Sequence, residues 1–189
     1  MLPAVLTAPD ITEAEFLDLC EKFPEALLEY TPEGTILIMP PTDPETSARV
    51  VSLVTQLSNW AEAEGNGIVI GPDGGFFLPG GSRRSPDAAW FDRARWQASK
   101  RPGTRFPEFA PEFLVEVRSP NDKIRLLREK MIEYMNAGVP LAWLIDPREK
   151  TVSIYRAGRV PETLDNPTTV AGEGPVAGFV LSLRSIFAN

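Results

Sequence analysis

A chain of 189 residues, 43% of them apolar, is long enough for one domain with a substantial core. It has no histidine, which excludes Ser-His-Asp and Cys-His catalysis and His-ligated zinc, and a single cysteine excludes intrachain disulfides and CxxC sites. No apolar run approaches the roughly 18 residues of a membrane span, and no basic segment followed by an apolar one opens the chain. We therefore expect a cytoplasmic protein without membrane contact, in which any hydrolysis relies on carboxylates, lysine and metal.

The net charge of −7 is unevenly distributed. Residues 1–66 hold twelve acids and two bases, whereas residues 83–130 hold twelve bases and seven acids, a local balance of 12 − 7 = +5. A nucleic-acid backbone could be steered to the basic segment while the acidic one faces solvent or another subunit. An ordinary mixed surface would give the same pattern, because charge patterning indicates partners only weakly.

The first third of the chain predicts a helix, a hairpin and a second helix. Apolar residues recur at helical spacing over 11–20, where Thr12 and Glu15 form a capping-box pattern. Strand-like runs at 26–30 and 35–39 flank a turn sequence and predict a β-hairpin. A long amphipathic helix follows over about residues 45–63 and stops at a Gly-Asn-Gly sequence. Its expected buried stripe is Val50, Val51, Val54, Leu57, Trp60 and Ala61.

Strands dominate the remainder. Runs at 68–70, 75–78 and 87–91 predict three strands, in which we expect Trp90 and Phe91 to be core residues, and 97–111 predict a polar loop. After a strand near 113–117, Ser119 is the expected N-cap of a helix that runs to Ala137. Residues 141–145 and 151–155 predict a hairpin, 157–176 are turn-rich, and 179–187 predict a closing strand and short helix. This order predicts a single α+β domain with a central mixed β-sheet flanked by helices.

Two lone carboxylates, Asp87 and Glu116, stand in otherwise apolar strand-like runs. Strand interiors rarely carry acids without a reason. Alternation places Glu116 on one strand face together with Leu114 and Arg118. If the two strands pair, Asp87 and Glu116 converge, and a divalent cation would relieve their repulsion. The pattern indicates a metal-dependent phosphodiester hydrolase, and the alternative is a salt-bridged or solvent-facing acid on each strand.

These residues resemble the Uma family of restriction endonuclease-like proteins in the PD-(D/E)XK nuclease superfamily, over most of the chain. The motifs that carry the resemblance are Pro86-Asp87, the segment 116–120, the helical segment 128–134 and the segment 138–147. The resemblance implies a nuclease core over 44–156, preceded by an N-terminal helix and hairpin extension (1–43) and followed by a closing segment (157–189). It also implies a DNA endonuclease with Mg²⁺ or Mn²⁺ held by Asp87, Glu116 and the carbonyl of Val117. The auxiliary acid that such sites sometimes have on the long helix would be Glu45.

The family pattern is broken at one position, because Arg118 stands where the superfamily has a lysine. Arginine stays protonated and cannot act as a base. Glu116 lies about 10 Å back along its strand from the expected helix start, a depth that an antiparallel helix regains after about seven residues. Since helical side chains lean toward the N-terminus, a lysine that reaches this depth should lie one turn further along the helix. Lys130 meets this requirement, whereas Lys123 begins too close to the strand end.

Lys130 has apolar neighbours, whose burial could lower its pKa, so we expect it to position or deprotonate the attacking water. The alternative is a surface lysine whose stem covers the core. Arg118 could clamp a phosphate oxygen, with Lys123 as a further contact.

Two other functions remain open: an inactive nuclease-fold module that binds nucleic acid or a protein partner, and an oligomeric scaffold. Duplex cleavage needs two active sites, so a homodimer or higher homo-oligomer is expected.

Overall fold

The structure, a computed structural model, describes residues 4–7, 11–31, 33–99, 106 and 108–188. Its helices are α1 (Glu13–Lys22), α2 (Pro44–Glu64), α3 (Arg93–Ser99), α4 (Ile124–Asn136) and the 3₁₀ turn η1 (Gly174–Val176). Its strands are β1 (Ala4–Thr7), β2 (Leu27–Tyr30), β3 (Thr35–Met39), β4 (Gly67–Ile70), β5 (Phe76–Phe77), β6 (Arg83–Arg84), β7 (Ala88–Asp92), β8 (Phe113–Val117), β9 (Leu141–Asp146), β10 (Thr151–Arg156), β11 (Glu162–Asp165), β12 (Thr169–Ala171) and β13 (Val180–Ser182).

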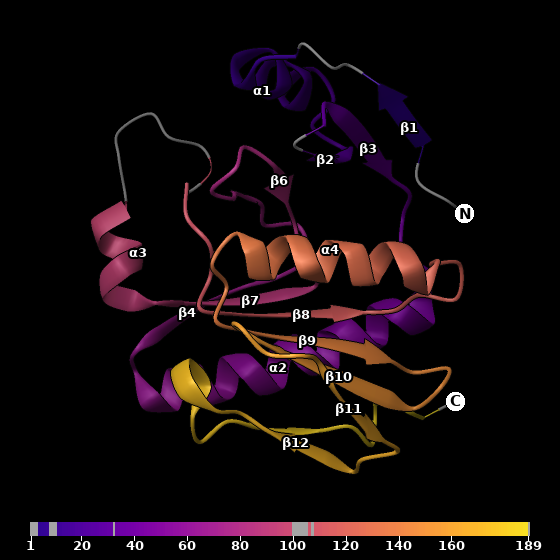
Figure 1. Ribbon diagram of the computed structural model, residues 1–189, viewed down its shortest axis with the longest axis vertical. Coiled ribbons are helices and arrows are strands. Elements are labelled where there is room, and N and C mark those ends of the chain that lie inside the picture. The colour runs from indigo at the N-terminus through magenta and orange to yellow at the C-terminus, as the bar shows by residue number, and fades with distance from the viewer. Residues whose placement is uncertain (1–3, 8–10, 32, 100–105, 107, 189) are drawn as a thin grey trace.

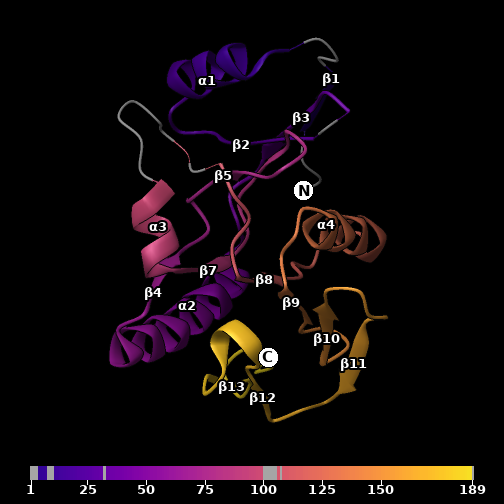
Figure 2. The same cartoon turned by 60° about the vertical axis from the view of Figure 1, so that its left-hand side comes forward.

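A six-stranded sheet forms the centre of the fold, in the order β11-β10-β9-β8-β7-β4. Strands β8 and β9 are parallel, because α4 crosses over between them, and the other pairs are antiparallel. Helices α2 and α4 lie on opposite sides of strands β7 to β9 (Figures 1 and 2). The expected α+β class with a mixed central sheet is therefore confirmed.

The two faces of the central sheet have separate cores. Val115 and Val117 pack on the α2 side with Leu53 and Leu57. Leu114 packs on the other side, against Met131 and Tyr134 of α4. This split confirms the alternation expected for β8, and Glu116 lies on the α4 side, where it contacts Tyr134.

A second sheet, β1-β3-β2-β6-β5, lies beside the central one and packs on α1 (Figure 1). The predicted hairpin is present as β2 and β3, and it pairs with β6 through Tyr30 and Arg83. The segment expected as a strand at 75–78 contributes β5 to this second sheet. The N-terminal hairpin therefore shares a sheet with a segment inserted between β4 and β7.

The helix boundaries match the sequence signals at most ends. Thr12 and Glu15 form the expected capping box of α1, and Gly65 ends α2 in a left-handed conformation. In α2, Val51 was wrongly assigned to the buried stripe, because it is 61% exposed and Leu53 is buried instead. Trp90 and Phe91 are buried, as expected.

Four further expectations were wrong. Helix α4 begins at Ile124 with Lys123 as its N-cap, and not at Pro120 with Ser119 as its N-cap, because the Ser119 amide donates to the Asp122 carboxylate and closes a turn before the helix. Helix α3 occupies the start of the predicted loop 97–111, of which 100–105 and 107 lie outside the described residues. The segment 157–176, expected to be turn-rich, contains β11 and β12. Residues 184–186 form turns after β13, where a short helix was expected.

No helix in the described part of the chain is long and apolar enough to cross a membrane.

Candidate active site

Asp87 and Glu116 converge because β7 and β8 pair in antiparallel register. Ala88 lies opposite Val115, and extending this register by one residue brings Asp87 opposite Glu116. Asp87 Oδ2 accepts a hydrogen bond of 2.7 Å from the Val117 amide. Asp87 keeps partial contact with solvent, whereas Glu116 is 5% exposed.

Burial and neighbouring charges change the ionisation of the two acids. Burial, together with the nearby Glu116 charge, raises the pKa of Asp87 to about 7 from its ordinary 3.8. Burial also raises the pKa of Glu116, although the ammonium of Lys130 opposes that shift. Two carboxylates that resist simultaneous ionisation form a site that a cation would stabilise.

Lys130 reaches the same point from α4. Its Nζ lies 2.8 Å from Oε1 of Glu116, an oxygen to which the hydroxyl of Tyr134, one helical turn further on, donates at 2.9 Å. Burial alone would lower the pKa of Lys130, but the carboxylates of Glu116 and Glu29 outweigh it and raise that pKa. The expectation of a lowered lysine pKa was therefore wrong, because the apolar neighbours in sequence gave no sign of the acids that the fold brings to the amine.

Glu29 is a site residue that the sequence analysis missed. It lies on β2 of the second sheet with 2% of its surface exposed, and its Oε1 accepts from Lys130 Nζ at 2.9 Å. Burial alone would raise its pKa, but Lys130 and Arg84 hold that pKa below its ordinary value. The signal was present, since Glu29 is a single acid within a strand, as Glu116 is. A two-stranded hairpin with one solvated face gave no reason to apply that criterion.

Arg84 of β6, which the sequence analysis counted only as part of the basic segment, holds Glu29 in place. Its Nη1 donates to Glu29 Oε2 at 3.0 Å, and its Nε donates to Glu133 Oε1 of α4 at 3.0 Å. The Ser85 amide donates to Glu29 Oε1 at 3.0 Å. A mostly buried ionic network therefore joins β2 and β6 of the second sheet to α4 and β8.

The other residues singled out from the sequence do not join this cluster. Arg118 pairs with Asp146 at 2.7 Å, and Lys123 is exposed at the N-cap of α4. The Glu45 side chain is 76% exposed and lies 3.8 Å from Arg49. Among the described residues, none of these three has a recorded hydrogen bond or ion pair with Asp87, Glu116 or Lys130. Val117 contacts the cluster through its amide.

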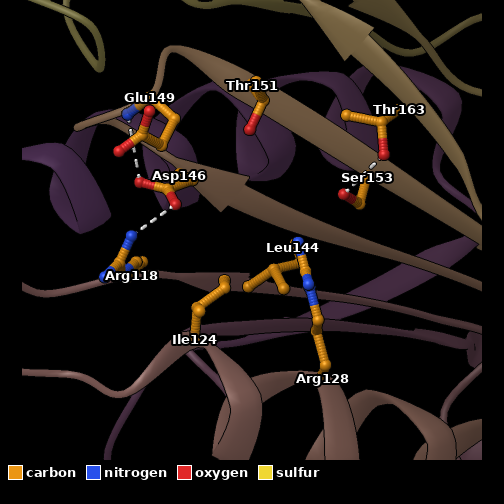
Figure 3. A pocket seen from close by; sticks show the side chains of 9 residues that line it. All are labelled: Arg118, Ile124, Arg128, Leu144, Asp146, Glu149, Thr151, Ser153 and Thr163. Carbon is orange, nitrogen blue, oxygen red and sulfur yellow. Dashed lines mark hydrogen bonds and ion pairs between the residues drawn. The ribbon is translucent and has the colours of Figure 1, made fainter.

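A groove of about 430 Å³ lies beside the cluster, between α4 and strands β9 to β11 (Figure 3). Leu144, the sheet partner of Glu116, forms part of its wall. Figure 3 shows Arg118 directed at Asp146 across one end. The charges that line the groove balance, with Arg118 and Arg128 against Asp146 and Glu149. The full lining is Arg118, Ile124, Arg128, Leu144, Asp146, Glu149, Thr151, Ser153 and Thr163.

The donor set at Asp87 and Glu116 fits magnesium in one of its usual modes. Within the described ranges, no group of three or more His, Cys, Asp or Glu residues is placed to hold a metal ion. Magnesium, however, usually keeps several waters and binds through one or two carboxylates plus substrate phosphates. Burial first, and the Glu116 charge second, raise the pKa of Asp87, and a bound cation would oppose both effects by stabilising the carboxylate. Asp87 and Glu116 are therefore the residues able to hold it.

Comparisons with known proteins agree with this fold. The family model Uma2, described as "Putative restriction endonuclease", matches residues 13–184. Among solved structures, the chain is similar to the crystal structure of a "putative nuclease belonging to DUF820" from Anabaena variabilis ATCC 29413, with 25% identity and a TM-score of 0.77. That match covers 94% of this chain and 97% of the other. No curated protein matches the chain significantly.

Proposed function

The chain belongs to the Uma2 family of restriction endonuclease-like proteins, and on this premise we propose that it is a magnesium- or manganese-dependent endonuclease that hydrolyses phosphodiester bonds of DNA. The observation that carries the proposal is the meeting of Asp87, Glu116 and Lys130 at one point, from three different elements. Two carboxylates and a lysine are the groups that a chain without histidine can offer for this chemistry.

Each residue has a distinct role in this proposal. Asp87 and Glu116 hold the metal, and the Val117 amide orients the Asp87 carboxylate. The bound metal would supply Lewis-acid stabilisation of the phosphate and a water of lowered pKa. Lys130 keeps its ammonium beside Glu116, where it orients the attacking water and stabilises charge that develops on the phosphate. Its raised pKa makes the ammonium a better match to these tasks than to proton abstraction.

DNA would approach along the groove beside the cluster. Arg118 directs Nη1 to Asp146 and Nε toward the Asp122 carbonyl at 3.4 Å, and its Nη2 has no hydrogen bond recorded among the described residues. A guanidinium held on one edge can still donate to a phosphate oxygen from the other. Because duplex cleavage requires two cuts, we propose that two copies of the chain act as a homodimer or within a larger homo-oligomer.

The test is nicking of supercoiled plasmid DNA with magnesium or manganese. Asp87→Ala should abolish metal-dependent nicking, and Glu45→Gln, an exposed acid outside the cluster, should leave it within about twofold. Equal nicking by the wild type and Asp87→Ala would reject the proposal.

A second candidate is a nuclease-fold module that binds nucleic acid or a protein partner without cleaving. Arg118 in the superfamily lysine position favours it, since arginine cannot serve as a base. Retention of DNA by the wild type without nicking, under any divalent metal, would support this reading over the first.

A further inference from the structure

Glu29 is held more rigidly than a surface acid could be. Its carboxylate accepts from three donors: Lys130 Nζ at 2.9 Å, the Ser85 amide at 3.0 Å and Arg84 Nη1 at 3.0 Å. With 2% of Glu29 exposed, water does not compete for these bonds. Charge-assisted hydrogen bonds in a buried site are short and directional, so the carboxylate has one position.

This carboxylate shares Lys130 with the central sheet. Lys130 Nζ lies 2.9 Å from Glu29 Oε1 and 2.8 Å from Glu116 Oε1, so the ammonium bridges two acids that come from different sheets. A lysine side chain has a flexible four-carbon stem, and a single partner leaves it free to swing. The second contact from Glu29 restricts Lys130 to the side of Glu116 that Tyr134 also contacts.

We propose that Glu29 is a positioning residue of the active site, which holds the Lys130 ammonium beside Glu116 in the place where the amine acts. The inference rests on the proposed nuclease function, in which Lys130 touches the reacting groups. It makes the N-terminal hairpin part of the active site, because Glu29 of β2 contacts Lys130 of α4. A misplacement of about 1 Å in such a group is enough to lower a catalytic rate strongly.

The chain offers a matched control in Glu133. This residue pairs with Arg84, as Glu29 does, but it has no recorded contact with Lys130 among the described residues. Glu133→Gln therefore disturbs the same arginine without touching the lysine. An effect of Glu29→Gln that Glu133→Gln does not share is attributable to Lys130.

The experiment is a double-mutant cycle on metal-dependent plasmid nicking. Glu29→Gln should lower kcat at least 20-fold with KM within threefold, and Glu133→Gln should change kcat less than threefold. In a Lys130→Ala background, Glu29→Gln should lower kcat less than threefold further, because the residue through which it acts is gone. Equal losses in both backgrounds, or an equal loss in Glu133→Gln, would overturn the proposal.

A second measurement tests the positioning role of Glu29 without measuring nuclease activity. In the wild type, an amine-acylating reagent should modify Lys130 at least tenfold more slowly than exposed Lys123, as read by peptide mass spectrometry. Glu29→Gln should raise the Lys130 rate at least fivefold with Lys123 unchanged. If Glu29→Gln fails to fold, Glu29→Asp, which keeps the charge on a shorter stem, should raise the rate in the same direction.

An unchanged Lys130 rate in a folded Glu29 variant would contradict the positioning role. If the wild type does not cleave DNA, the nuclease proposal fails by itself. The acylation rates then still decide whether Glu29 holds Lys130.

Discussion

The two sheets bring their acids to the cluster in different ways. The central sheet places Asp87 and Glu116 opposite each other by regular backbone pairing of adjacent strands. The second sheet brings Glu29 to the cluster through contacts of its side chain with Lys130, Arg84 and the Ser85 amide, and Lys130 is 101 residues away in sequence. Local patterning encodes the first arrangement, whereas the second depends on how two sheets pack. The comparison shows that one candidate site can combine residues placed by local strand pattern with a residue placed by the packing of two sheets.

The largest expected effect on nicking comes from removing the Lys130 amine. Lys130→Ala should lower metal-dependent nicking by about 10²–10⁴-fold, because it removes the ammonium that faces Glu116. Lys123→Ala removes an exposed lysine at the N-cap of α4 and should leave the nicking rate within about threefold of the wild type. Nicking rates on supercoiled plasmid provide the measurement. Similar losses in the two variants would show that α4 contributes general positive charge only.

Breaking the network of the second sheet should cost stability. Arg84→Met leaves the buried Glu29 without one of its two cations, a change that typically costs about 3–5 kcal/mol when a buried pair loses a partner. Arg125→Met, in the exposed pair with Glu129, should cost about 0.5 kcal/mol or less. Urea unfolding of both variants measures the difference. Equal costs would mean that the buried network adds nothing to the attachment of the second sheet.

The pKa of Asp87 gives the metal-free protein a pH dependence of known sign. Between about pH 4 and pH 7 the folded state keeps a proton on Asp87 that the unfolded state has released. The contribution of Asp87 to the free energy of unfolding is therefore complete below pH 4 and is lost as the pH rises to 7. In EDTA at pH 8, Asp87→Asn should therefore raise the free energy of unfolding by about 1–3 kcal/mol, reduced from a full shift because Asp87 contacts solvent.

At pH 4 the gain from Asp87→Asn should vanish, because both the wild-type carboxyl and the amide are then neutral. Thermal melts across this pH range provide the measurement, with exposed Glu45→Gln as the control. A gain that is independent of pH would mean that burial and the Glu116 charge do not raise the pKa of Asp87 in the folded protein.

The smallest expected effect concerns Arg118→Lys, which restores the superfamily lysine position. If Lys130 supplies the amine, nicking should stay equal or fall by up to about tenfold, because the contact with Asp146 and the phosphate clamp are weakened. A rise of tenfold or more would instead show that Arg118 impairs the natural site. The same plasmid assay distinguishes the two results.

Much of the arrangement of the cluster could be predicted because it follows strand and helix periodicity. Alternation in β8 predicted the face on which Glu116 lies, and the depth of an antiparallel helix predicted that Lys130 lies near it. The helix start was misplaced, yet the six residues from Ile124 to Lys130 still span about 9 Å, close to the required depth. The turn that Ser119 and Asp122 close takes the place of the first helical turn expected there.

The contact of Glu29 with Lys130 and the raised pKa of Lys130 could not be predicted, for a shared physical reason. Both depend on the second sheet lying against α4, which no local pattern specifies. Apolar neighbours in sequence pointed to a lowered lysine pKa, but two carboxylates delivered from separate sheets outweigh burial. Long-range charge contacts therefore set the chemistry of a residue whose position local geometry had already indicated.

The most direct test of the metal site is anomalous scattering from crystals soaked in manganese. The proposal predicts a peak between Asp87 and Glu116, about 2.0–2.3 Å from a carboxylate oxygen of each, with waters completing the coordination. The peak should be lost in Asp87→Ala crystals. Manganese bound elsewhere, with no peak between these two carboxylates in the wild type, would contradict the account.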